Sequence, residues 1–173
     1  MKKISPLVSL IPLLMSFAAF SAIAASDSLP LPSSVLKDNL ETFEIDCPNN
    51  PQQTTVDLDD CMGTKRAQVE AIESKYVTTA RQLIANSPDF SKEQTQKILD
   101  AFDAENKAWD TLIATAAHAT EVNWDGGTVR AAKATDREIK LIELRVHNQW
   151  QNWLRYEDST PPALPEPKFK NVE

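Results

Sequence analysis

The sequence predicts an all-α protein: an elongated antiparallel three-helix bundle with an N-terminal arm that one disulfide ties down. Three observations lead to this prediction. Apolar side chains recur at alternating spacings of four and three along three long segments, which is the period of an amphipathic helix. Short breaks rich in Pro, Asn or Gly separate these segments, and short connections favour antiparallel neighbours. No segment of useful length alternates with the period of two that indicates a strand.

Residues 1–24 have the features of a signal peptide. Lys2 and Lys3 form a basic start, an apolar run follows, and small residues lead up to a cleavage site after Ala24, with Ala25 as the alternative. No second apolar segment of membrane-spanning length follows. We therefore expect an exported protein of the periplasm without a membrane span.

The charge balance is acidic. The precursor has a formal net charge of -7, and removal of residues 1–24 takes away two lysines, which leaves -9. Such a field repels nucleic acid and anionic lipid, and it favours a cationic protein partner. Plain solubility is the simpler explanation of the same charge.

Residues 25–53 form the expected N-terminal arm, which is rich in Pro, Ser and Asn. Within it, one short helix is expected from Val35 to Thr42, capped by Ser33 or Ser34. The rest of the arm has no periodic pattern, so its position depends on a covalent tie.

Cys47 and Cys61 are the only cysteines of the chain, and an even count in an oxidising compartment favours a disulfide between them. Closing a loop of this size stabilises the fold by roughly 3 kcal/mol in the chain-entropy model. The alternative is two unpaired buried thiols, although exported proteins seldom keep two free cysteines so near one another.

The first two helices carry clear start and stop signals. The first should start at Thr54 or Thr55, where acidic side chains suit the positive end of the helix dipole, and end at residues 86–88. The second should begin at Ser91, with Gln94 three residues later as its capping-box partner.

A third helix should follow a break at residues 124–127, which contains two adjacent glycines. We expect this helix from about Thr128 to Tyr156, which completes a helical domain of residues 54–156. Residues 157–173 contain four prolines and scattered charge, so they are expected to be a Pro-rich flexible tail.

No constellation of residues indicates catalysis, a cofactor or a metal. His118 and His147 are the only histidines, they fall on different expected helices, and no zinc-binding spacing is present. An enzyme acting on peptidoglycan would need paired carboxylates, for which Glu105 on a buried helix face is the best candidate. A simpler expectation is that Glu105 pairs across the bundle with Lys65 or Arg145.

The tryptophans divide into two groups. Trp124 lies in the glycine turn, where it is either an exposed anchor for a partner or a lid over the bundle end. The candidate binding residues are accordingly Trp124, Asp125, Gly126 and Gly127. The other three occupy helical seam positions and are expected in the core: Trp109, Trp150 and Trp153.

Several of these features together resemble the lysozyme-inhibitor LprI-like family of bacterial secreted proteins, over roughly residues 47–153. They are a Thr-rich acidic lead before a cysteine (residues 54–61), Tyr76, the pair Ala108-Trp109, the Gly126-Gly127 turn and Arg145. The two regions in which members commonly carry a second cysteine pair contain none here.

The resemblance implies a non-catalytic protein-binding module that inhibits lysozyme-like muramidases, with a cationic lysozyme as partner. The alternative is a structural or stress-related envelope module, which binds another envelope protein through its helical seam or its tail.

Overall fold

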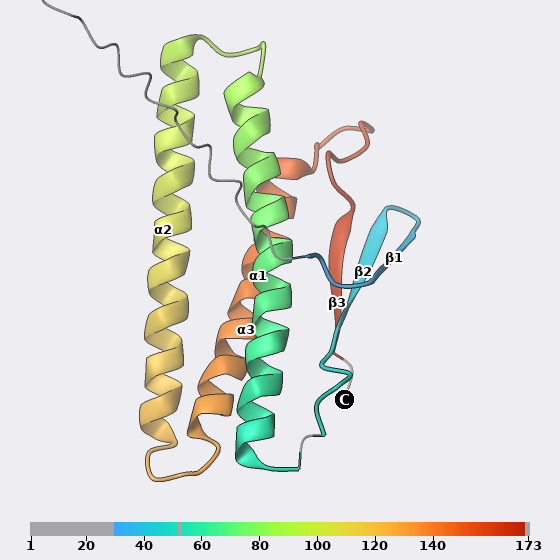
Figure 1. Cartoon of the computed structure of the whole chain (residues 1–173). Coiled ribbons are helices and arrows are strands. Elements are labelled where there is room, and N and C mark those ends of the chain that lie inside the picture. Colours follow the sequence, from blue (N-terminus) through green and yellow to red (C-terminus); the bar gives the residue numbers. More distant parts are fainter. Residues whose placement is uncertain (1–29, 52, 172–173) are drawn as a thin grey trace, which may run out of the picture.

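The structure, a computed structural model, describes residues 30–51 and 53–171. The expected signal peptide, residues 1–24, lies outside them. Three helices, α1 (Thr55–Asn86), α2 (Lys92–Asn123) and α3 (Arg130–Gln149), stand beside a sheet of β1 (Ser34–Lys37), β2 (Leu40–Ile45) and β3 (Glu166–Asn171) (Figure 1). The prediction of an all-α protein was therefore wrong, because the segments taken for an arm and a tail contribute strands.

The first two helices begin and end where their caps require. The Thr54 hydroxyl accepts a hydrogen bond from the Asp57 backbone N–H at 3.1 Å, and the Asp57 carboxylate accepts one from the Thr54 N–H at 3.0 Å. Ser91 and Gln94 make the same reciprocal pair at the start of α2. These capping boxes satisfy backbone donors that have no partner inside the helix, and they confirm both predicted starts.

Helix α3 is shorter than predicted. It ends at Gln149 and continues as a π-helical turn, η1 (Trp150–Leu154), closed by a hydrogen bond of 3.0 Å from the Arg155 N–H to the Trp150 carbonyl. The Trp150 indole then donates to the Leu164 carbonyl at 3.0 Å. The chain thus leaves the helix before Tyr156 and folds back along the bundle.

The predicted helix at Val35–Thr42 is instead a β-hairpin. Its two-residue turn places Asp38 at φ 51° and Asn39 at φ 61°. Both residue types tolerate this left-handed conformation, and a turn with two positive φ values matches the twist of paired strands. Strand pairing therefore overrides the weak helical pattern of the segment.

The flexible-tail prediction was wrong for Glu166–Asn171, because these residues form β3 and pair parallel to β2. Phe169 lies opposite Phe43, and their rings stack with centroids 6.1 Å apart. The Tyr76 hydroxyl donates to the Pro165 carbonyl at 2.8 Å, and burial raises the pKa of this phenol. The C-terminal segment is thereby part of the packed fold.

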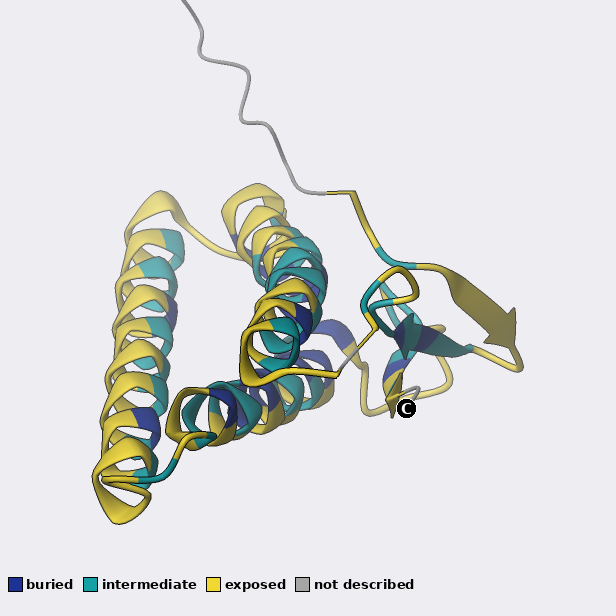
Figure 2. Cartoon of the chain, turned by 60° about the horizontal axis from the view of Figure 1, so that its bottom comes forward, coloured by how far each residue is buried: buried dark blue, intermediate teal, exposed yellow. Residues whose placement is uncertain are grey.

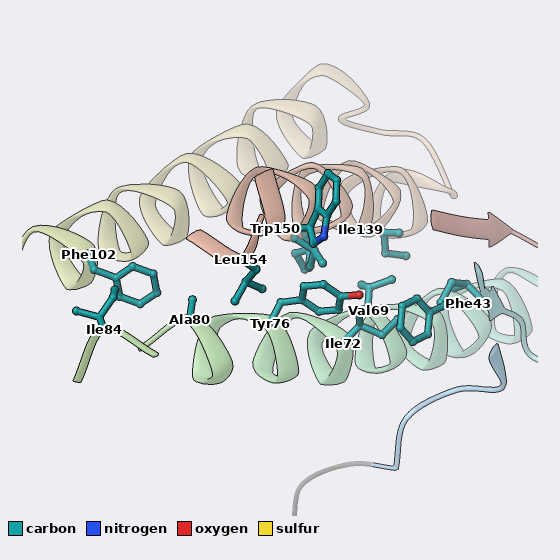
Figure 3. Packing of buried hydrophobic residues seen from close by; sticks show 13 residues of the cluster. Phe43, Val69, Ile72, Tyr76, Ala80, Ile84, Phe102, Ile139, Trp150 and Leu154 are labelled. Carbon is teal, nitrogen blue, oxygen red and sulfur yellow. The ribbon is translucent and has the colours of Figure 1, made fainter. Parts of the chain in front are cut away.

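Most of the core lies between α1, α3 and the sheet, and Leu154 of η1 and Phe102 of α2 extend it (Figure 3). Phe43 of β2 and Tyr76 of α1 are fully buried there. Helix α2 packs mainly against α3 and has much less contact with α1. Most of its surface is accordingly exposed, as Figure 2 shows.

The predicted disulfide is present. Cys47, which follows β2, is bonded to Cys61 in α1, with their Cα atoms 5.4 Å apart. Cys61 is 1% exposed. The bond joins the hairpin to the first turns of α1.

Candidate functional site

Both glycines suit the turn between α2 and α3. Gly126 has φ +79°, a conformation that is strained for residues with a side chain. At Gly127 an added Cβ would lie 3.0 Å from the Trp124 carbonyl oxygen, which already accepts a hydrogen bond of 2.9 Å from the Gly127 N–H. The turn is therefore tight, with Trp124 at its first position.

Trp124 is held at this end of α2 by its backbone. As the C-cap residue it donates its N–H to the Thr120 carbonyl at 3.1 Å. Its side chain is exposed to 41%, and the Lys133 ammonium lies 5.4 Å from the centre of its ring. The exposure favours the anchor over the lid, because a lid would bury the ring against the bundle end.

Asp125 shapes the same turn and remains open to solvent. Its carboxylate accepts hydrogen bonds from the Gly126 N–H at 3.0 Å and from the Arg130 guanidinium at 3.4 Å. The Asp125 side chain is exposed to 81%. The structure thus brings the four predicted binding residues together in one short, exposed turn.

An ion cluster around the buried Arg145 lies at the middle of the bundle, and the sequence did not reveal its membership. Arg145 of α3 is 5% exposed, and its guanidinium binds Glu73 of α1 at 2.5 Å and Asp110 of α2 at 2.7 Å. It also donates to the Asn106 side-chain oxygen at 2.9 Å. Burial raises the pKa of Glu73, and the Arg145 charge opposes that rise. The cluster connects all three helices.

Glu105 does not pair with Arg145, which was one of the two partners expected for it. It accepts a hydrogen bond of 3.1 Å from the Trp153 indole N–H, and the Trp153 ring contacts Phe102 edge-on with centroids 5.1 Å apart. A carboxylate that receives an indole N–H fixes the position of the tryptophan. This contact gives Glu105 a structural role between α2 and η1.

The three tryptophans that were expected in the core differ in burial. Trp150 is buried at 9% exposure, whereas Trp109 and Trp153 are half-buried. The histidines do not meet: His118 is exposed on α2, and the His147 ring lies 5.6 Å from the Trp150 ring. Within residues 30–51 and 53–171, no three His, Cys, Asp or Glu side chains are grouped so that they could hold a metal.

A hollow, which was not predicted, lies at the end of α2 opposite the Trp124 turn. It has a volume of about 830 Å³ and is lined by the end of α1, the following loop, the start of α2 and η1. Its aromatic side chains are Phe90, Trp153 and Tyr156. Because these residues come from distant parts of the chain, no local sequence signal groups them.

A helix able to cross a membrane does not occur in the part of the chain that the structure describes. The Cys47–Cys61 disulfide is compatible with an exported protein. In the comparisons with known proteins, no family model, no curated protein and no solved structure matches the chain.

Proposed function

We propose that this chain is an exported, non-catalytic protein-binding module that inhibits a cationic muramidase of the lysozyme class through the Trp124 turn. The observation that carries the proposal is the exposed indole at the tip of a turn fixed by two glycines. Tryptophan is enriched among the residues that dominate binding energy at interfaces. A ring on a rigid turn also loses little conformational freedom when it enters a cleft.

Charge supports the same type of partner. With residues 1–24 removed the formal net charge is -9, so a cationic enzyme is attracted over distances near the Debye length. At the turn itself the charges do not add to this attraction, because Asp125 is paired with Arg130 and Lys133 lies by the indole. The long-range field therefore accelerates encounter, while the indole supplies the close contact.

The test is a titration of residues 25–173 into a muramidase assay on cell-wall substrate at low and at raised salt. Saturable inhibition should persist in raised salt, with slower association, and should be lost in Trp124→Ala. The matched control is Leu112→Ala, because Leu112 is 48% exposed on the same helix. Equal inhibition by Trp124→Ala and the wild type would contradict a role for the turn.

The alternative, an envelope module that captures its partner through the C-terminal tail, is less favoured. Residues 166–171 are the third strand of the sheet, and Phe169 packs on Phe43. Deleting residues 158–173 would therefore damage the core as well as any tail contact. This alternative would be favoured if the wild type and Trp124→Ala captured a partner equally well and neither protein inhibited a muramidase.

A further inference from the structure

The hollow at the start of α2 has the lining of a binding groove for an uncharged ligand. Its volume of about 830 Å³ lies within the roughly 300–1,000 Å³ typical of small-molecule sites. Of its thirteen lining residues, all among those the structure describes, only Asp89 carries a formal charge. In the cleft beside Arg145, by contrast, six of nine lining residues are charged.

The walls of this groove combine aromatic rings with neutral hydrogen-bonding side chains. Phe90 and Tyr156 are 43% and 45% exposed, and Trp153 lies with them. The rest of the lining consists of Asp89, four aliphatic residues and five neutral polar residues, of which the polar ones are Thr79, Gln82, Asn86, Ser87 and Asn152. The groove therefore offers both apolar faces and hydrogen-bond partners.

The polar side chains keep hydrogen-bonding capacity for a ligand. Asn86 donates one N–H to the Gln82 carbonyl at 2.8 Å, and Asn152 donates one to the Asn148 carbonyl at 3.0 Å. Each amide retains a carbonyl oxygen and a second N–H. The Gln82 side chain, exposed on α1, has no hydrogen bond to any described residue.

These features distinguish between ligand classes. An anion would find no cation in the lining, and a cation would find only Asp89. An acyl chain or an apolar peptide would pack on the four aliphatic residues, but it would take water from the five polar side chains without replacing its hydrogen bonds, which is unfavourable. A sugar matches both surfaces, because its C–H faces pack on the electron-rich faces of aromatic rings while its hydroxyls bind amides.

We propose that this groove binds an uncharged oligosaccharide. The site is separate from the Trp124 turn, because the two lie at opposite ends of the 32-residue helix α2. Two such sites allow the protein to hold a glycan at one end and a protein partner at the other.

Isothermal titration of residues 25–173 with two uncharged probes tests the proposal: a β-1,4-linked N-acetylglucosamine tetrasaccharide and cellotetraose. At least one should bind saturably. Phe90→Ala and Tyr156→Ala should each weaken that binding at least tenfold, since both rings are exposed and their loss leaves the core intact. Circular dichroism and melting temperature verify that each variant is folded.

The control and the polar variant make the test specific. Trp124→Ala removes an equally exposed aromatic ring at the other end of α2, so it should leave oligosaccharide binding unchanged. Gln82→Leu should weaken the tetrasaccharide while strengthening binding of an apolar probe such as octanol. The Phe90→Ala variant should still inhibit the muramidase. A failure of the oligosaccharide proposal can therefore be distinguished from a failure of the proposed muramidase inhibition.

Two results would overturn the proposal. They are absence of binding by both tetrasaccharides, and wild-type affinity in both Phe90→Ala and Tyr156→Ala.

Discussion

Helices α1 and α2 have the same length, 32 residues, yet they are packed very differently. The structure describes every residue of both helices. Six residues of α1 are buried, whereas in α2 only Phe102 and Ala117 are buried. We call the side formed by α1, α3 and the sheet the closed side, and α2 with its two ends the open side.

The difference separates stability from binding. The closed side contains the fully buried Phe43 and Tyr76 and the disulfide. The open side presents the Trp124 turn at one end, and at the other end it shares the aromatic groove with the end of α1 and with η1. Buried apolar area is the main source of stability, and exposed aromatic rings on fixed backbone are favourable for recognition. Substitutions on the closed side should accordingly lower stability, whereas substitutions on the open side should weaken binding.

The largest effect is expected from a matched pair of phenylalanines. Phe43→Ala on the closed side should lower the free energy of unfolding by about 3–5 kcal/mol, because Phe43 is fully buried. Phe90→Ala on the open side should change it by less than ~1 kcal/mol, because Phe90 is 43% exposed. Urea unfolding of both variants measures the contrast, and similar losses would remove the distinction between the sides.

Arg145 joins the two sides, so its loss should also be severe. Arg145→Met leaves Glu73 half-buried without its cation and should cost about 3 kcal/mol of unfolding free energy. The double variant Arg145→Met/Glu73→Met should recover much of the loss, since no unpaired charge then remains between α1 and α3. A double variant that is no more stable than Arg145→Met would show that packing, and not charge, explains the cost.

The disulfide should contribute somewhat less. Replacing Cys47 and Cys61 with Ser should lower the unfolding free energy by about 2–4 kcal/mol, because the unfolded chain regains the freedom of a loop whose ends are 14 residues apart. Far-ultraviolet circular dichroism should show little change in helix content. An unchanged melting temperature would mean that strand pairing and core packing hold the hairpin without the disulfide.

The smallest effect is a pH dependence at Glu143. Burial raises the pKa of this carboxyl, and the Asn171 amide, which donates to it at 3.3 Å, opposes the rise. A raised folded-state pKa stabilises the fold below the ordinary value of 4.5, and this contribution is lost as pH rises through the folded-state pKa.

Glu143→Gln should therefore raise the unfolding free energy at pH 8, by less than ~1 kcal/mol, and leave it nearly unchanged at pH 4. Melting temperatures of both proteins across this range provide the measurement. A gain that is equal at both pH values would contradict an electrostatic origin.

Helices were predictable from the sequence because their signals are local. Ser91 and Gln94 are three residues apart, and the two glycines of the turn between α2 and α3 are adjacent. Strand β3 lacks such a signal, since it pairs with β2 more than 120 residues earlier, as in Phe43 with Phe169. The prolines of the C-terminal segment also resemble those of a flexible segment, although Pro167 is accommodated because β3 is an edge strand.

The hairpin turn could have been recognised. Asp38-Asn39 combines two residue types that tolerate positive φ, and the flanking residues favour strands. The Trp124 turn was found because its residues are consecutive, whereas the groove and the Arg145 cluster each combine three separate segments. Sites of that kind depend on how the helices pack, which periodicity does not specify.

The most direct test of this account is the inhibition constant of Trp124→Ala against a cationic lysozyme, measured beside the wild type on protein whose melting temperature is unchanged. The account predicts saturable inhibition by the wild type and a loss of at least a hundredfold in the variant. Wild-type inhibition by Trp124→Ala, or no inhibition of any lysozyme class by the wild type, would contradict it.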